Sequence, residues 1–195
     1  MSVERFDLRR LAPQPWKNGA GLTREIAFGG TDSASFDWRM SVAEVERDAP
    51  FSAFPAIDRR IVLLHGAGMR LLSADGCIDH ALTEALVPFA FAGEVPLTAT
   101  LIDGASRDFN VMTRRGAFRS ELLCHRTATT LMAGDVTLLL CCDGEWSATA
   151  ADGAPLTLAP QQALLWRTPV ESIDARPISA PASLLQVRLC HDRPR

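Results

Sequence analysis

The residues best suited to binding chemistry lie together near the N-terminus, in the stretch PWKNGAGLTREI at residues 15–26. Lys17 supplies a point charge, Asn18 offers both a hydrogen-bond donor and an acceptor, and Arg24 presents a planar fork that matches a carboxylate. Trp16 provides an apolar wall whose indole N–H is a further donor. The stretch therefore predicts a loop that recognises an anionic group such as a carboxylate.

Two glycines, at positions 19 and 21, set this stretch apart from a regular strand. Glycine favours turn conformations and allows a ligand or a neighbouring strand to approach the backbone closely. A purely structural loop is the alternative, in which Arg24 pairs with Glu25 or Asp58 and Trp16 caps a barrel. The residue types alone leave both interpretations open.

Strand alternation adds side chains from three other segments to the predicted pocket. The polar sides of DWRMSV at 37–42 and RDFNVMTR at 107–114 are expected to line a common cavity. FSAFPAIDRR at 51–60 adds Phe51 and Phe54 as an apolar wall next to a charged pair, for which a surface ion pair is the alternative. The predicted ligand-binding residues are Trp16, Lys17, Asn18, Arg24, Arg39, Ser41, Phe54, Asp58, Arg59, Asp108, Asn110, Met112 and Arg114.

Period-two alternation also predicts the fold class. Trp38 and Met40 fall on one side of a segment whose other side is polar, as expected for a strand. Turn pairs such as Asp75-Gly76, Asp103-Gly104 and Asp143-Gly144 separate apolar runs, a pattern typical of hairpins. Helical periodicity is weak throughout the chain. These patterns predict an all-β fold.

An internal repeat refines this prediction. The segment at 61–76 resembles the segment at 137–153, with Leu63 aligned on Leu139 at an offset of 76 residues. Each copy reads as a series of short strands separated by turns, which predicts two jelly-roll barrels of the cupin type. Chance similarity between two leucine-rich segments is the alternative. We expect an N-terminal barrel over 1–117 with the ligand pocket, and a C-terminal barrel over 118–195 that serves mainly as scaffold.

Composition excludes several classes of protein. The chain of 195 residues carries 20 Lys and Arg against 23 Asp and Glu, so there is no basic footprint for nucleic acid. The N-terminus MSVERFDLRR is too charged for a signal peptide, and no apolar run approaches the length of a membrane span. Five cysteines without CxxC spacing predict reduced thiols. We expect a cytoplasmic protein that binds neither nucleic acid nor membranes.

Cupin barrels commonly hold a metal through a His-x-His pair, a Glu and a later His. This chain has four histidines, and the positions that would correspond to the ligands in the first copy fall near Ala53, Pro55 and Arg59. The second copy is equally unsuited to a metal. We therefore predict no metal and no cofactor. The lone His65, at a predicted turn, is interpreted as structural, with a functional role as the alternative.

Four strings occur in order between about residue 10 and residue 116: PWKNGAGLTREI, WRMSVAEVERDAPFSAFPAIDRRIVLLHG, PFAFAGEVPLTATLIDG and RDFNVMTRRG. Together they closely resemble the HutD/Ves family. The resemblance implies a bicupin of RmlC-like double-stranded β-helix barrels, a cytosolic bacterial protein, and an association with histidine utilisation. The resemblance also implies binding of a small carboxylic acid such as formylglutamate. One departure is GAGL at 19–22, where relatives often have a triple glycine followed by threonine.

Two functions remain open at this point. The first is a metal-independent bicupin that binds a small carboxylic acid as a regulatory or accessory protein of histidine utilisation or the stress response. The second is a metal-free enzyme, an isomerase or hydrolase, that uses Lys17 or His65 as its base. We favour the first because no nucleophile, base and orienting group form a recognisable arrangement. Homodimer formation is left open.

Overall fold

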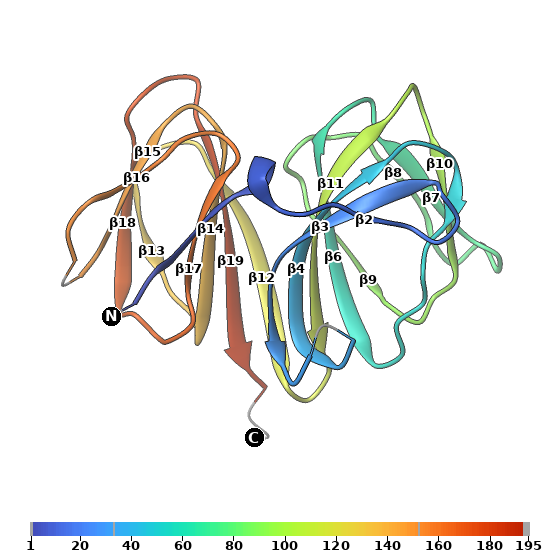
Figure 1. Cartoon of the computed structure of the whole chain (residues 1–195), viewed down its shortest axis with the longest axis horizontal. Helices are drawn as coiled ribbons and strands as arrows, with labels where there is room; N and C mark the ends of the chain where they lie inside the picture. Colours follow the sequence, from blue (N-terminus) through green and yellow to red (C-terminus); the bar gives the residue numbers. More distant parts are fainter. Residues whose placement is uncertain (1, 33, 152, 193–195) are drawn as a thin grey trace. The chain divides into compact units, whose positions relative to one another are not determined.

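The computed structural model describes residues 2–32, 34–151 and 153–192. Its regular structure is a set of β-strands together with one short 3-10 helix, η1 (Leu8–Arg10) (Figure 1). The all-β prediction is therefore confirmed. Among these residues no helix is both long enough and apolar enough to cross a membrane.

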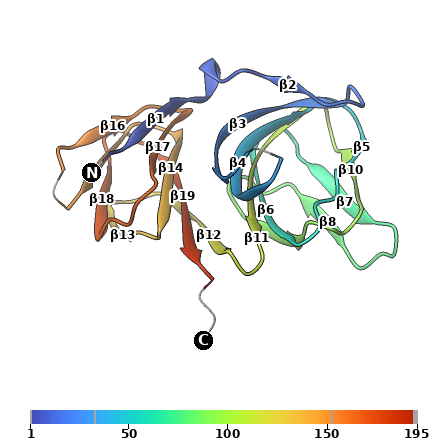
Figure 2. The same cartoon turned by 60° about the horizontal axis from the view of Figure 1, so that its bottom comes forward.

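Residues 12–118 form one compact unit. One of its two sheets has the strand order β2-β3-β4-β11-β6-β9 and the other has the order β5-β10-β7-β8, with antiparallel pairing throughout (Figures 1 and 2). The strands are β2 (Gln14–Pro15), β3 (Gly21–Gly30), β4 (Phe36–Val45), β5 (Ala49–Pro50), β6 (Ile57–His65), β7 (Met69–Ser73), β8 (Asp79–Leu82), β9 (Phe89–Ala92), β10 (Leu97–Leu101) and β11 (Ser106–Arg114).

The second unit comprises residues 1–11 and 119–195. Its sheets have the orders β1-β17-β14-β19-β12 and β13-β18-β15-β16. The strands are β1 (Glu4–Asp7), β12 (Phe118–His125), β13 (Thr129–Met132), β14 (Val136–Asp143), β15 (Trp146–Ala150), β16 (Leu156–Leu158), β17 (Gln162–Trp166), β18 (Ser172–Pro177) and β19 (Ser183–His191).

The two units repeat one strand order. The pairing β4-β11-β6-β9 in the first unit corresponds to β12-β19-β14-β17 in the second, and β5-β10-β7-β8 corresponds to β13-β18-β15-β16. Leu63 and Leu139, which anchored the sequence repeat, lie on the equivalent strands β6 and β14. The repeat therefore covers eight strands, more than the local sequence similarity indicated.

The first eleven residues depart from the predicted division at residue 117. They were expected in the N-terminal barrel, but β1 pairs antiparallel with β17, so that Glu4 lies opposite Leu165. The Leu8 N–H donates to the Gln161 carbonyl over 2.9 Å, and Arg167 Nε pairs with the Glu4 carboxylate at 2.5 Å. The sequence did not reveal this because a strand that pairs with a partner more than a hundred residues away leaves no local pattern.

The turn pairs have the expected conformation but only some of the expected connections. Gly76, Gly104 and Gly144 have φ of +73°, +66° and +67°, a region that favours glycine. Asp75-Gly76 joins β7 to β8, which pair as a hairpin. Asp103-Gly104 and Asp143-Gly144 instead lead the chain from one sheet to the other. A glycine turn in the sequence thus predicts that the chain changes direction, but it does not predict with which strand the next segment pairs.

The two sheets of the first unit pack through a shared apolar cluster. Its buried members come from both sheets and are Val45, Ile61, Leu63, Met69, Leu71, Leu82, Phe91, Leu97 and Ala99. Burial of several such side chains contributes about 1.5 to 3 kcal/mol each. The inward side of the larger sheet is therefore anchored at one end by this core, and the rest of that side carries both polar and apolar side chains.

Candidate functional site

A cavity of about 540 Å³ opens in the first unit, between its larger sheet, the β2–β3 hairpin and the segment that follows β5. This volume is within the range of sites for small molecules. The lining residues are Gln14, Pro15, Trp16, Lys17, Asn18, Thr23, Arg39, Ser41, Ala43, Pro50, Phe51, Ser52, Phe54, Arg59, Asn110 and Met112. Ten of them were predicted from the sequence: Phe51, expected as part of the apolar wall, and nine of the predicted ligand-binding residues, namely Trp16, Lys17, Asn18, Arg39, Ser41, Phe54, Arg59, Asn110 and Met112.

Strand register explains how distant residues meet in this cavity. Met112 on β11 lies opposite Arg39 on β4 and Arg59 on β6, and Asn110 lies opposite Ser41 on β4. Because residues two apart on a strand share a face, these side chains form adjacent rows on the inward side of the sheet.

Arg59 is the cation at the floor of the cavity, and only 6% of its surface is exposed. One of its terminal nitrogens donates to Asn110 Oδ1 at 2.8 Å, and the other lies 3.5 Å from the Ser52 carbonyl. Its Nε has no hydrogen-bond partner among the described residues. Burial lowers the pKa of Arg59 to about 10, opposed by the Asp108 charge and assisted by Arg39, so the group remains cationic at neutral pH.

Three aromatic rings surround this guanidinium. Its central carbon lies 5.2 Å from the ring centre of Phe51, 5.7 Å from that of Phe54 and 5.0 Å from that of Phe91. Cation–π attraction of this kind contributes about 0.5 to 2 kcal/mol per ring, with the larger values at desolvated sites. The rings therefore stabilise the buried charge while leaving its N–H groups for polar partners.

Asp108 lies beneath the cavity and does not line it. Its side chain is fully buried, and its Oδ1 accepts a hydrogen bond from Asn110 Nδ2. Burial raises the pKa of Asp108 to about 7, although the nearby Arg59 charge and the Asn110 hydrogen bond both oppose that shift. Asp108 was predicted as a ligand-binding residue, but it does not line this cavity, because the apolar core covers its end of the β11 row.

Arg39, the second cation of the wall, has its own counter-ion. Its Nε lies 2.8 Å from the Glu25 carboxylate in an ion pair whose atoms are not aligned for a hydrogen bond. Each side chain is 16% exposed. Because Glu25 lies opposite Ser41, it occupies the same inward side of the sheet. The charge of Arg39 is therefore largely balanced within the wall.

The β2–β3 hairpin forms the mouth of the cavity. The Gly19 N–H donates to the Trp16 carbonyl at 2.9 Å, and Gly19 has a φ of +67°. The Asn18 side-chain oxygen caps the turn by accepting from the Ala20 N–H at 3.1 Å. Lys17 is exposed at the turn. The stretch is thus both a tight hairpin loop and part of the cavity wall.

Trp16 serves as a wall, as expected, but its indole N–H is already engaged. It donates to Thr23 Oγ1 at 2.8 Å, and the indole ring meets Phe51 edge to face with centroids 6.4 Å apart. A ligand therefore meets the faces and edges of these rings, while the hydrogen bond fixes the orientation of Trp16.

Three further predicted residues lie away from the cavity lining, namely Arg24, Arg114 and Asp58. Arg24 is adjacent to Thr23 and so points to the opposite side of β3, where its Nε lies 3.2 Å from Glu44. The structural alternative for Arg24 was an ion pair with Glu25 or Asp58. An ion pair does form, but its partner is Glu44. Arg114, at the end of β11, donates to the Phe36 carbonyl at 2.7 Å and pairs with Asp37.

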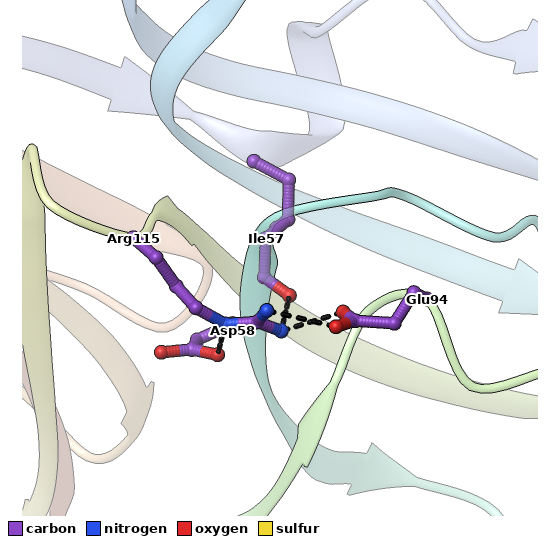
Figure 3. A network of polar contacts seen from close by, with 4 residues as sticks. All are labelled: Ile57, Asp58, Glu94 and Arg115. Atoms are coloured by element: carbon purple, nitrogen blue, oxygen red, sulfur yellow. Dashed lines mark hydrogen bonds and ion pairs between the residues drawn. The ribbon is translucent and has the colours of Figure 1, made fainter.

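Asp58 lies on the outward side of β6 and pairs with Arg115 instead of lining the pocket. Arg115 Nε lies 2.7 Å from Asp58 Oδ1, while its two terminal nitrogens reach the two oxygens of Glu94 at 2.8 and 2.5 Å (Figure 3). The same guanidinium approaches the Ile57 carbonyl at 3.4 Å. This network ties the start of β6 to neighbouring loops and has a structural role.

The sequence analysis missed six lining residues: Gln14, Pro15, Thr23, Ala43, Pro50 and Ser52. Thr23 and Ala43 could have been found from alternation, since each shares a strand face with a predicted or paired residue. The other four come from short edge strands and a loop, for which no periodic pattern exists. His65, considered as a base, is exposed at the end of β6 and does not line the cavity.

Within the described part of the chain, no group of three or more His, Cys, Asp or Glu side chains is placed to hold a metal ion. The absence of a bound metal stays a prediction. The arrangement at the cavity offers cations, amides and aromatic rings, which suit an anionic organic ligand.

Comparison with known proteins identifies the family. The HutD family model matches residues 9–180. Protein Ves of Cronobacter sakazakii is 38% identical over 168 residues, covering 85% of this chain and 87% of that protein. A conserved protein of unknown function from Pseudomonas aeruginosa PAO1 superimposes with a TM-score of 0.87 at 31% identity, covering 97% of this chain and 100% of that one.

HutD from Pseudomonas fluorescens SBW25, determined in a formate condition, superimposes with a TM-score of 0.84 at 25% identity, covering 98% of this chain and 100% of that one. A cupin 2 conserved barrel domain protein from Leptotrichia buccalis shares the fold, with a TM-score of 0.59 at 10% identity over 96% of this chain and 97% of its own. The fold is therefore cupin-like. The chain belongs to the HutD/Ves family.

Proposed function

We propose that the cavity of the unit 12–118 binds a small carboxylic acid, of the formylglutamate type, without a metal ion. Arg59 carries this proposal: its buried guanidinium lies at the floor of the cavity, and its side-chain hydrogen bond goes to a neutral amide, that of Asn110. A charge-assisted hydrogen bond from such a group to a carboxylate is strong and directional. The remaining lining residues would then recognise the rest of the acid.

The surrounding chemistry supports an organic acid over an inorganic anion. Phe51, Phe54 and Trp16 provide an apolar wall, while Asn110 and Ser41 supply polar groups on the opposite side. Lys17 at the mouth adds a solvent-exposed positive charge that attracts anions. A carboxylate with a short carbon chain matches this combination of charge and apolar surface.

Membership of the HutD/Ves family supports a proposal about the biological role. We propose a bicupin of two jelly-roll barrels, in which the second serves as scaffold, acting in the cytoplasm as a regulatory or accessory protein of histidine utilisation. Support comes from the repeated order of eight strands in two sheets, which is the composition of a jelly roll.

An enzyme is the second candidate, and Asp108 is the observation that favours it. A carboxyl whose pKa is raised to about 7 beneath a cavity is typical of acid–base sites. However, Asn110 lies between Asp108 and the cavity, so Asp108 cannot reach a proton on a ligand directly. Binding without turnover is therefore the function that the geometry supports best.

Calorimetric titration with formate, glutamate and N-formyl-glutamate tests the proposal, together with a turnover assay on the last. We expect at least one acid to bind with a single site, and Arg59→Ala to weaken that binding by tenfold or more. Arg70→Ala is the matched control, since Arg70 pairs with Asp79 on the surface of the same unit. Equal affinities in the parent and a folded Arg59→Ala protein would overturn the proposal.

A further inference from the structure

The inward side of the larger sheet carries two cations and two carboxylates. Arg39 is paired with Glu25, and Arg59 is linked to Asp108 through the side chain of Asn110. When both carboxylates are ionised, the four charges cancel. An anion that enters the cavity then finds a neutral wall, with Lys17 as the nearby exposed cation. Loss of charge on one of the carboxylates therefore strengthens anion binding.

Asp108 is the carboxylate better placed to do so. It has no exposed surface, and its Oδ2 lacks a hydrogen-bond partner in the described parts of the chain. Glu25, by contrast, is partly exposed and has Arg39 within 2.8 Å. A buried carboxylate oxygen without a partner costs free energy, which protonation removes.

The groups that face Asp108 come from each neighbouring element. Arg59, on β6, faces Asp108. The backbone partner of Asp108 on β4 is the uncharged Ala43. The opposing sheet contributes apolar residues around Leu63, namely Met69, Leu71, Leu97 and Ala99. His80 on that sheet stacks on Phe89 with centroids 3.8 Å apart. Burial thus raises the pKa of Asp108, and Arg59 is the charged group that opposes this shift.

We propose that Asp108 is a proton site coupled to the cavity, so that an acid anion at Arg59 and a proton at Asp108 bind together. This inference rests on the proposed function. With Asp108 neutral, the positive charge of Arg59 is available to the ligand, while Asn110 still connects the two side chains. Asp108 acts as a positioning residue, since it reaches the ligand only through Asn110 and Arg59.

The direction of the pH effect follows from linkage. An anion near Asp108 disfavours its charged form, so the midpoint of its titration rises in the complex above its value of about 7 in the free protein. Affinity for the anion is highest where Asp108 is protonated in both states. It falls by up to about tenfold per pH unit as pH rises between the two midpoints.

The test uses the full-length protein with sodium formate as the probe, because formate stays ionised above about pH 6. The carboxyl ¹³C shift of Asp108 is followed by NMR against pH, with and without formate, and formate affinity is measured at each pH. We expect a free-protein midpoint near neutrality that rises with formate, and an affinity that falls with pH. Asp108→Asn should bind formate with an affinity independent of pH.

Asp58→Asn is the matched control, because Asp58 is exposed and lies on the other side of β6. It should leave both the Asp108 midpoint and the pH dependence unchanged. Titration of Asp108 below pH 5, or formate binding that does not move its midpoint, would overturn this inference while leaving acid binding intact. Failure of every acid to bind would instead overturn both proposals. The measurement on the parent protein decides the matter even if Asp108→Asn does not fold.

Discussion

Arg39 and Arg59 lie on either side of one residue, since both are backbone partners of Met112 on the central strand β11. The two guanidinium groups nevertheless differ in environment. Arg39 is matched by an adjacent carboxylate, whereas Arg59 is surrounded by aromatic rings and an amide. Identical side chains in one row thus have distinct roles, and variants at the two positions should behave differently.

Arg59→Lys should weaken acid binding by several-fold, and less than Arg59→Ala does. Lysine retains the charge but loses the planar fork, the bond to Asn110 and the stacking on the rings. Loss of one charge-assisted hydrogen bond corresponds to about 1.5 to 3 kcal/mol, or tenfold or more in affinity. Calorimetry on both variants gives the comparison. Full affinity in Arg59→Lys would show that charge alone is recognised.

Lys17→Ala and Arg24→Ala should separate the two cations of the N-terminal stretch. Lys17 lines the mouth, so its loss should weaken acid binding by a few-fold, mainly at low salt where exposed charges are less screened. Arg24 pairs with Glu44 on the opposite side of β3, so its loss should leave affinity unchanged. Titrations at low and moderate salt check both. An equal loss in the two variants would contradict this assignment.

Asp108→Asn should change how stability depends on pH. The unfolded state has an Asp pKa near 3.8 and the folded state has it raised to about 7, so the folded protein binds the extra proton between these values. The stability of the parent should therefore fall as pH rises from about 4 to about 7, by at most roughly 4 kcal/mol from this group.

The asparagine variant lacks this titration, so its stability relative to the parent should increase from pH 5 to pH 8. Urea unfolding at both pH values measures the difference. Asp37→Asn is a suitable control, since Asp37 is a surface partner of Arg114. Parallel stability curves for parent and Asp108→Asn would show that Asp108 titrates in the ordinary acidic range.

Purified protein should contain well below one equivalent of transition metal. The positions that would match the cupin ligands are Ala53, Pro55 and Arg59 in the first copy, and such a set offers no neutral imidazole. Elemental analysis after dialysis provides the measurement. One tightly held equivalent of iron, nickel or zinc, whose removal abolishes acid binding, would contradict the prediction.

Strand alternation predicted which side of the sheet a residue faces better than it predicted how deeply the residue is buried. Arg39, Ser41, Asn110 and Met112 share the inward side as expected, because a strand places every second side chain on one side. Asp108 has the same parity but lies under the core, where the opposing sheet covers it. Strand alternation does not predict that the opposing sheet covers Asp108, because this burial depends on contacts between strands far apart in the chain.

Arg24 shows a different limit. The chemistry of its guanidinium predicted it as a ligand-binding residue, whereas the neighbouring Thr23 lines the cavity. The irregularity between Glu25 and Ala27 on β3 also shifts the register with β4, so alternation cannot be extended across it from sequence. Residue type therefore identified the right stretch, but pairing decided which of its side chains face the ligand.

The pairing of β1 with β17 also sets an order of events during synthesis. β1 leaves the ribosome well before its partner β17, which begins at Gln162. The whole of residues 12–118 emerges in the interval and can complete its own sheets. β1 therefore stays without its partner strand until the segment through β17 has been synthesised. The charged residues in its sequence ERFD are suited to this unpaired state, since charges on an open strand edge discourage association with other chains.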